Sequence, residues 1–355
     1  MGQFDEYNGE TILVTGGAGC IGSNLCKTLS NLDAHRIIIL DDLSSAYEWN
    51  VPNAENIDFV HGSVLNDEDL KRVFKEKPTF VFHLAAHFAN QNSVDNPETD
   101  LMVNGLGILK TLQFAQMVDV KRFVYSSSGC GVYGLDSEIP FKEHDISIHL
   151  HTPYQITKLL GELYTNYFHN LYNVPIVNAR FFNVFGPGEI PGTYRNVIPN
   201  FFYWALKRQS LPITGDGSET RDWTYVGDIV DGLLTMGITD EAIGEAINLG
   251  SGIETKVIDM ASMINTLTEN PYDIKFINRR NWDVKKQLCS SIEKAENILN
   301  YHPKTSFSNG LKNLYDWFKS NWDNIDRSSE FPEHLKQQWD ENRRNGEQIE
   351  IKKTR

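Results

Sequence analysis

The segment Thr11–Gly22 reads TILVTGGAGCIG. It opens with apolar and β-branched residues, a run typical of a strand that is covered on both faces in a parallel sheet. Glycines follow at once and lead into a helix-like stretch, Ile21–Leu32. A strand, a glycine-rich turn and a helix in this order form the phosphate-binding unit of dinucleotide-binding folds. The segment therefore predicts an α/β domain that binds a dinucleotide.

Each glycine of this turn has its own task. Three glycines divide these tasks: one permits the tight turn, one lets the backbone approach a pyrophosphate, and one lets helix and strand pack closely. They are Gly16, Gly19 and Gly22. Cys20 and Ile21 begin the helix, whose free N–H groups would point at the phosphates. We expect these five residues to bind the cofactor.

Strands and helices continue to alternate through the first half of the chain. The predicted strands are Thr11–Thr15, Arg36–Leu40, Ile57–His61, Thr79–Leu84, Arg122–Ser127 and Val174–Arg180. The predicted helices are Ile21–Leu32, Asp67–Lys75, Pro97–Val118 and Pro153–Tyr172. This alternation predicts an α/β fold of the Rossmann type, a doubly wound parallel sheet.

The pattern changes after Arg180, where prolines and glycines interrupt regular structure. We expect a dinucleotide-binding domain at 1–180, to which some later segments return, and a smaller mixed α/β substrate lobe at 181–320. Residues 321–355 are charged and poor in apolar side chains, so we expect a solvated tail there, with one helix candidate at Glu333–Arg343.

The composition excludes several classes of protein. A chain of 355 residues that is 40% hydrophobic can bury a large core, and its net charge of −14 argues against a nucleic-acid partner. No apolar run is long enough to span a membrane. The four scattered cysteines indicate free thiols in a cytoplasmic protein rather than a metal site or a disulfide framework.

Two acids follow the second predicted strand. Asp41 and Asp42 lie about 20 residues beyond the third glycine, where a carboxylate accepts hydrogen bonds from the adenosine ribose. The same charge repels a 2′-phosphate, so we expect NAD rather than NADP. Asp41 is the preferred ribose ligand because it is nearer the strand end, with Asp42 close behind.

A catalytic group is predicted further along the chain. Tyr154 and Lys158 lie one helical turn apart, on one face of a predicted helix. A run of three serines, Ser126–Ser128, ends the preceding strand, at the sheet edge where ligands bind. A serine hydroxyl there can bridge a substrate oxygen to the tyrosine, while Lys158 and the nicotinamide would lower the tyrosine pKa. Together these groups indicate a redox site.

From about Thr11 to Phe318 the chain resembles the extended short-chain dehydrogenase/reductase family, in particular its NAD-dependent nucleotide-sugar epimerases and dehydratases. The segments that carry the resemblance are Thr15–Gly22, His83–Ala86, Val132–Gly134, Tyr154–Lys158, Arg180–Pro187, Arg221–Trp223 and Val226–Asp228.

The resemblance implies further site residues. Leu84, Ala85, Ala86 and Asn104 would line the NAD groove, and Ser63 and Val64 would lie at the adenine, although relatives usually carry an acid where Ser63 stands. Asn183 and Asn196 would hold the sugar nucleotide. Arg221, Arg280 and Asp283 would clamp its diphosphate and ribose, since arginines bind phosphates through paired, charge-assisted bonds.

The serine loop departs from the family pattern because it is one residue longer than usual. Counted from the strand, Ser128 is the catalytic and substrate-binding hydroxyl, with Ser127 as the alternative. The same count places Cys130 where GDP-sugar 3,5-epimerases carry a catalytic cysteine. The usual partner base of those enzymes is replaced here by Arg195-Asn196-Val197.

The resemblance favours 4-epimerisation of a UDP-sugar through a 4-keto intermediate. Dehydratases of the family carry acids after the serine, where this chain has Gly129-Cys130, and decarboxylases carry a glutamate in place of Gly131. Gly129 and Gly131 would leave room for a turning sugar, or serve packing. The alternatives are a 3,5-epimerase that uses Cys130, a decarboxylase or dehydratase, and a non-enzymatic NAD-sensing regulator.

Relatives in this family commonly form homodimers through two helices. Here these helices correspond to the one with Tyr154 and the one predicted at Pro97–Val118. Their apolar residues include Leu106, Leu109, Leu159 and Leu163, which would face a second copy or the sheet.

Overall fold

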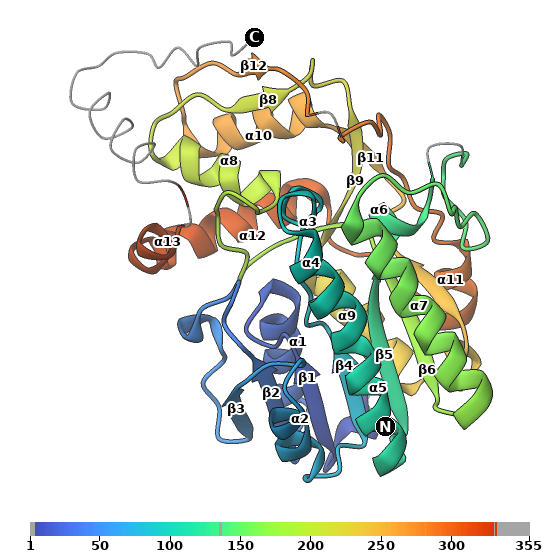
Figure 1. The fold of residues 1–355 in the computed structure, drawn as a ribbon. Helices are drawn as coiled ribbons and strands as arrows, with labels where there is room; N and C mark the ends of the chain where they lie inside the picture. The colour runs from blue at the N-terminus through green and yellow to red at the C-terminus, as the bar shows by residue number, and fades with distance from the viewer. Residues whose placement is uncertain (1–3, 135–136, 281, 330, 332–355) are drawn as a thin grey trace.

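The computed structural model describes residues 4–134, 137–280, 282–329 and 331. Its main body is a seven-stranded sheet of order β10-β6-β5-β4-β1-β2-β3, in which every strand pairs parallel to its neighbours (Figure 1). The strands are β1 Thr11–Thr15, β2 Arg36–Asp41, β3 Ile57–His61, β4 Phe80–His83, β5 Arg122–Ser128, β6 Ile176–Phe181 and β10 Ala246–Leu249. The strand order reverses beside β1, which is the switch point where such sheets bind ligands.

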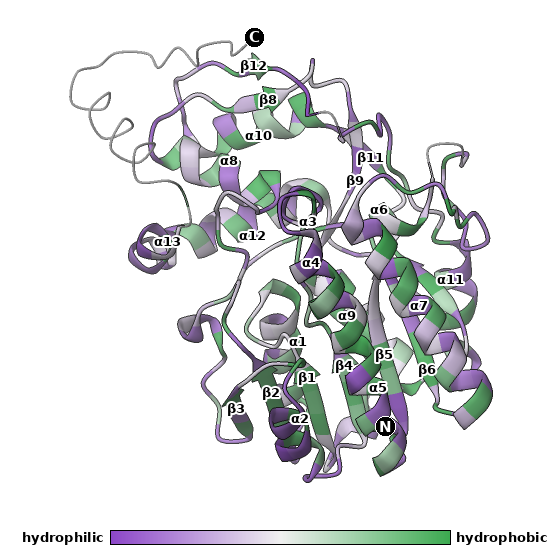
Figure 2. Ribbon diagram, viewed as in Figure 1, coloured by the Kyte–Doolittle hydropathy of each residue, from purple (hydrophilic) through white to green (hydrophobic). Residues whose placement is uncertain are grey.

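Helices cover both faces of this sheet. One face carries α2 Asp67–Phe74, α5 Gly107–Val118 and α7 Pro153–Tyr172, and the other carries α1 Cys20–Asn31, α9 Val226–Ile238 and α11 Glu293–Leu299 (Figure 1). In β1, Ile12 and Val14 join the core beneath α1 and α9, whereas Leu13 joins the core beneath α2 and α5. The middle of the strand is therefore apolar on both faces, and Figure 2 accordingly colours the central strands as hydrophobic.

The predicted doubly wound sheet is confirmed. Each predicted strand and helix of the first half has a counterpart, but the stretch Pro97–Val118 is not one regular helix. It divides into α4 Pro97–Asp100, a π-helical turn η3 at Leu101–Leu106, and α5. The remaining short elements are η1 Asp5–Tyr7, η2 Glu48–Asn50, α3 Asn90–Asp95, α6 Gly129–Val132 and η4 Asp240–Ala242.

The C-terminal lobe is built around a separate core. Its strands are β7 Asn183–Phe185, β8 Pro212–Thr214, β9 Thr220–Tyr225, β11 Glu254–Lys256 and β12 Lys275–Ile277, and its helices are α8 Val197–Leu206, α10 Val257–Thr268 and α12 Phe307–Ser320. The strands form a sheet of order β11-β9-β7 and a parallel pair, β12-β8. Aromatic side chains such as Phe201, Phe202 and Phe318 fill the core. Between the two parts of the lobe, α9 and β10 return to the large sheet.

The expectation of a solvated tail from residue 321 onwards was wrong at its start. Trp322–Ser328 form α13, in which Ile325 is fully buried in the lobe core. Trp322 stacks on Tyr203, and Asp326 pairs with Lys207 at 2.9 Å. These contacts exist because α8 presents an aromatic side chain, and the C-cap residue after it a cationic one, to this segment. The helix candidate at Glu333–Arg343 lies outside the described residues.

Within the described ranges, no helix is both long and apolar enough to cross a bilayer. Nor do three or more histidine, cysteine or acidic side chains gather there in a way that could hold a metal ion.

Candidate active site

One cavity opens along the carboxyl ends of β1, β4, β5 and β6 and extends under the C-terminal lobe. It gathers residues that are far apart in the sequence. The predicted site residues that line it are Gly16, Gly19, Cys20, Ile21, Gly22, Asp41, Asp42, Ser63, Val64, Leu84, Ala85, Ala86, Ser128, Cys130, Tyr154, Lys158, Asn183 and Asn196. Asn104, Arg221, Arg280 and Asp283 are not among the lining residues.

The glycine-rich turn has the geometry that a pyrophosphate requires. Gly16 has a φ of 72°, and a Cβ there would lie 2.6 Å from the backbone nitrogen of Ala85. A Cβ at Gly22 would collide with the carbonyl oxygen of Gly16. The N-cap of α1 is Gly19, which offers no side chain to cap the helix. The first N–H groups of α1 are thus available to an anion, and the residues fit a dinucleotide.

The two acids after β2 have different surroundings. Asp41 is buried, and its carboxylate accepts hydrogen bonds from the backbone N–H of Ala18 at 3.0 Å and of Leu43 at 2.9 Å. Burial raises its pKa, which these two bonds oppose. Asp42 is more exposed and accepts a bond from the Ser63 hydroxyl at 3.3 Å. Asp41 therefore anchors the glycine-rich turn, while Asp42 and Ser63 form a polar pair in the cavity.

Tyr154, Ser128 and Lys158 meet on the wall formed by β5 and α7. Burial raises the pKa of Tyr154, and a hydrogen bond from Ser128 lowers it. The Lys158 ammonium lies 5.7 Å from the centre of the Tyr154 ring and donates to the Ser126 carbonyl at 2.7 Å. Burial lowers the pKa of Lys158 to about 8, so the ammonium still predominates at pH 7. A phenol, a hydroxyl and a cation are thus held together beside one cavity, an arrangement that suits proton transfer.

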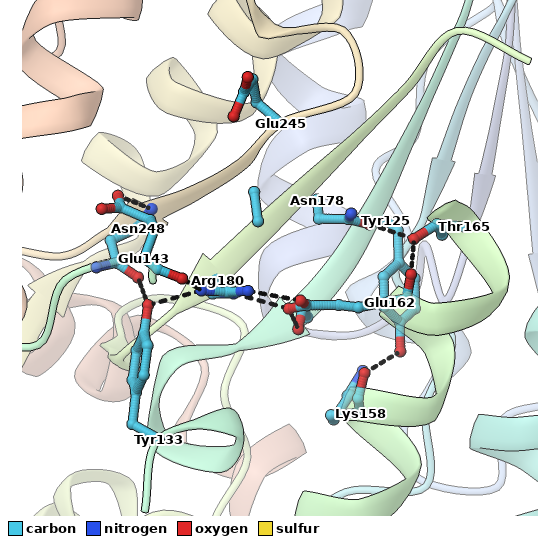
Figure 3. A network of polar contacts seen from close by, with 12 residues as sticks. Tyr125, Tyr133, Glu143, Lys158, Glu162, Thr165, Asn178, Arg180, Glu245 and Asn248 are labelled. Carbon is cyan, nitrogen blue, oxygen red and sulfur yellow. Dashed lines mark hydrogen bonds and ion pairs between the residues drawn. The ribbon is translucent and has the colours of Figure 1, made fainter. Parts of the chain in front are cut away.

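The neighbouring serine faces a different partner. The Ser127 hydroxyl bonds to Glu162, which pairs with the buried Arg180 through two contacts of 2.7 and 2.8 Å. Figure 3 shows Arg180 between Glu162 and Tyr133. Its guanidinium donates to the Tyr133 hydroxyl at 3.0 Å, and that hydroxyl donates to Asn248 at 2.5 Å. This network joins β5, α7, β6 and β10 behind the reactive wall, so it holds the strand that carries Ser128 against the helix that carries Tyr154.

Cys130 lines the cavity from α6 and has cationic neighbours. Burial raises the pKa of its thiol to about 11, against the charges of Lys285 and Arg221, which lower it. Lys285 donates from Nζ to the carbonyl oxygens of Cys130, at 3.1 Å, and of Tyr133. Burial lowers the pKa of Lys285 to about 8. Sequence patterns gave no sign of Lys285 here, because it is far from the serine loop in the chain.

Comparison with known proteins assigns the chain to a family. The profile of the NAD dependent epimerase/dehydratase family matches residues 12–250. The chain belongs to this family. UDP-glucose 4-epimerase of Mycolicibacterium smegmatis is 33% identical over 312 residues, which cover 87% of this chain and 98% of that enzyme. The resemblance to extended short-chain dehydrogenase/reductases is thereby confirmed, and so is NAD as the cofactor.

Two solved structures support the same assignment. An epimerase of Methanothermobacter thermautotrophicus is 70% identical with a TM-score of 0.92, over 92% of this chain and 97% of that one. The Bordetella bronchiseptica enzyme WbmF, crystallised with NAD+ and UDP, is 33% identical with a TM-score of 0.79, over 91% of this chain and 96% of that one. Since the relative from M. smegmatis and the structure from M. thermautotrophicus are both named epimerases, this member of the epimerase/dehydratase family is an isomerase, and the alternative of a non-enzymatic regulator finds no support.

The candidate substrate residues of this epimerase/dehydratase chain lie in three places. Asn183 and Asn196 reach the cavity, the former donating weakly to the Asp222 carbonyl at 3.4 Å. Arg221 and Asp283 contact each other at 3.4 Å, near Cys130. Arg280 is exposed, with its guanidinium 5.6 Å from the centre of the Trp282 ring.

Asn104 and Gly129 have surroundings that differ from those expected from the sequence. Asn104 lies behind the cavity wall, where its side chain accepts from the backbone N–H of His87 at 2.8 Å and donates to the carbonyl of His87 at 3.1 Å. It therefore supports the loop after β4 rather than lining the groove. Gly129 lies against the ring of Phe182, which a Cβ would strike. Packing thus accounts for this glycine without any need for substrate room.

Several cavity residues were not anticipated from the sequence. Phe88 packs edge-on against Tyr154, with ring centres 6.2 Å apart. Glu189 and Arg195 line the cavity from the segment that follows β7. In the sequence, only the position of this segment between two motifs indicated that it could lie near the site. The contacts of its side chains depend on how the C-terminal lobe folds back.

Proposed function

We propose that this enzyme is a UDP-sugar 4-epimerase that works through a transient 4-keto sugar. The observation that carries the proposal is the meeting of Ser128, Tyr154 and Lys158 beside a cavity whose other end is a dinucleotide-binding turn. The relative from M. smegmatis, named a UDP-glucose 4-epimerase, and WbmF, crystallised with UDP, support the choice of a UDP-sugar.

In the proposed reaction Tyr154 removes the proton of the C4 hydroxyl and later returns it. NAD takes up the C4 hydride and gives it back to the opposite face of the sugar. Ser128 donates a hydrogen bond to the C4 oxygen, and the Lys158 ammonium stabilises the phenolate form of Tyr154. No further acid or base is needed, which agrees with the absence of acidic side chains between Ser128 and Val132. Because each hydride returns, the cofactor would stay bound between cycles.

A second candidate is 3,5-epimerisation, of a GDP-type sugar. It is favoured by one observation, the position of Lys285 beside Cys130. A buried thiol and an amine whose pKa is about 8 could exchange protons at carbons next to a 4-keto group. The Lys285 side chain would then replace the partner base that the sequence lacks near Asn196.

One experiment separates the two reactions. The purified holoenzyme is incubated in deuterated water with UDP-glucose, UDP-N-acetylglucosamine, UDP-glucuronate and GDP-mannose, and the products are examined by NMR. We expect inversion at C4 of a UDP-sugar with no deuterium in the sugar ring. Deuterium at C3 or C5 would instead support the role of Cys130, and the absence of any product would contradict both assignments.

We also propose that the enzyme is a cytoplasmic homodimer. All four cysteines lie unpaired, as suits a reducing compartment. The outer side of α7 carries a stripe of exposed apolar residues beside η3, which also exposes apolar side chains. These residues are Ile156, Leu163, Tyr167 and Leu171 on α7, and Leu101 and Met102 on η3. Leu106, Leu109 and Leu159 are partly buried within the subunit. Such a stripe suits burial against a second copy.

A further inference from the structure

The segment 186–196, which follows β7, lies against the dinucleotide-binding side of the cavity. Asn24 of α1 donates to the Pro187 carbonyl at 2.8 Å, and Asn50 of η2 donates to the Gly188 carbonyl at 3.2 Å. At its other end Arg195 donates to the Ser45 carbonyl, in the loop after β2, at 2.5 Å. The segment is therefore fastened at both ends, and its side chains have defined positions in the cavity.

Glu189 is the buried acid of this segment. Only 7% of it is exposed, and it lines the cavity. Asn196 donates from its side chain to Oε1 at 2.6 Å, whereas Oε2 is buried with no hydrogen-bond partner among the described residues. An unpaired carboxylate oxygen in such a place is costly unless a ligand or a proton satisfies it.

Two helix N-termini flank this carboxyl. On one side is Cys20, the first residue of α1, whose pKa is raised in part by the charge of Glu189. On the other side is Asn196, the N-cap of α8, whose side chain does not cap its own helix because it bonds to Glu189. Neither helix has a side-chain cap, and such N-termini attract anions. The acid thus lies where anionic groups are expected.

We propose that Glu189 takes up a proton when the nucleotide sugar binds, and that its carboxyl then donates a hydrogen bond to a phosphate oxygen of that ligand. This inference rests on the proposed function, because it assumes that a nucleotide diphosphate occupies the α8 end of the cavity. The protonated form resolves the conflict between a carboxylate and a phosphate at one place. It also supplies a donor at the oxygen that has no partner in the protein.

The protein environment already prepares this proton uptake. Burial raises the pKa of Glu189 to about 7, against the opposing effects of Asn196 and the Arg195 charge. The charged and titratable groups that face it are Cys20 on α1 and Arg195 on its own segment. At pH 7 the carboxyl is therefore about half ionised, and a nearby phosphate would raise its pKa further. Binding at pH 7 should then consume roughly half a proton, and less at pH 6.

The test is calorimetric titration of the holoenzyme with UDP-glucose in buffers of different ionisation enthalpy. The Tyr154→Phe variant is used, because it prevents turnover and removes the phenol from the proton balance. Lys158 and Lys285, whose pKa values are about 8, are largely protonated at pH 7 and contribute little there. We expect the Tyr154→Phe protein to take up protons when UDP-glucose binds at pH 7. The double variant that also carries Glu189→Gln should take up none.

A matched control and the contrary results complete the experiment. Asp231→Asn changes a carboxylate outside the cavity whose pKa burial also raises, and it should leave the proton uptake intact. Binding of UDP-glucose without proton uptake at pH 7, or uptake that survives in Glu189→Gln, would overturn the role of Glu189 and leave the epimerase assignment standing. If UDP-glucose, UDP-N-acetylglucosamine and UDP-glucuronate all fail to bind, the proposed function falls and the inference with it.

Discussion

Ser127 and Ser128 are adjacent on β5, yet their hydroxyls face opposite sides of the strand. Ser128 lines the cavity beside Tyr154, whereas Ser127 bonds to Glu162, which belongs to the buried network of Figure 3. The alternation of side chains along a strand produces this division. The Ser128 hydroxyl is thus available to a substrate, whereas the Ser127 hydroxyl stabilises the fold.

This division predicts that one alanine variant loses activity while the other loses stability. Ser128→Ala should lower kcat by about 10²-fold or more, because a hydrogen bond at the reacting oxygen is lost, and should leave stability nearly unchanged. Ser127→Ala should lower the free energy of unfolding by about 1 kcal/mol, with kcat within a few-fold of the parent enzyme. Steady-state kinetics and urea unfolding check both. Equal loss of kcat in the two variants would contradict the assignment.

Residue-level prediction from the sequence succeeded where the signal is local. The glycine-rich turn, Asp41 and the Tyr154–Lys158 pair each lie within one strand, turn or helix, so spacing alone brings them to the cavity. Glu189 and Lys285 could not be found in this way. Glu189 reaches the cavity, and Lys285 reaches Cys130, because later segments of the chain fold back onto the dinucleotide-binding domain. A contact of that kind leaves no periodic pattern in the sequence.

Among the elements, α7 combines a well-defined start with very close packing. Thr152 and Gln155 form a capping box, Pro153 is its first residue, and Asn173 ends it in the left-handed conformation. These end signals are why its bounds could be predicted. By contrast, no end signal marks the π-helical turn in Pro97–Val118, where Asn104 bonds to His87 of another segment.

The close packing of α7 against β5 depends on Gly161. A Cβ at this position would strike the hydroxyl and ring of Tyr125. We predict that Gly161→Ala lowers the free energy of unfolding by about 2 kcal/mol, although alanine favours a helix, because overpacking outweighs that gain. The displaced helix should also lower kcat, since it carries Tyr154 and Lys158.

The matched control for Gly161→Ala is Gly105→Ala. A Cβ at Gly105 would meet only the ends of Leu101 and Leu160, both at 3.2 Å, which can move aside. Its unfolding free energy should stay within about 1 kcal/mol of the parent. Urea unfolding of the two variants, with kcat measured alongside, tests the explanation. A Gly161→Ala protein as stable as Gly105→Ala would refute it.

At the scale of the whole molecule, the exposed stripe on α7 predicts the oligomeric state. Leu163 is 58% exposed near the middle of this stripe. We expect the purified protein to be a dimer and Leu163→Glu to be a monomer, because a charge would have to be buried in the interface. Sedimentation velocity gives the mass, and Ile253→Glu, at an exposed apolar position in the lobe, is the control that should remain dimeric. A monomeric parent protein at micromolar concentration would exclude the proposed interface.

The return of β10 to the large sheet has a consequence for biosynthesis. Residues up to Phe181 supply six strands of this sheet, but the seventh, which pairs with β6, is synthesised only after much of the lobe. While the chain is still on the ribosome, the outer edge of β6 lacks its neighbour, and such an edge invites pairing with foreign strands. The nascent polypeptide is therefore most exposed to aggregation before Leu249 has emerged. The family profile ends at residue 250, one residue after β10. The part of the chain that matches the family therefore ends where β10 covers the edge of β6.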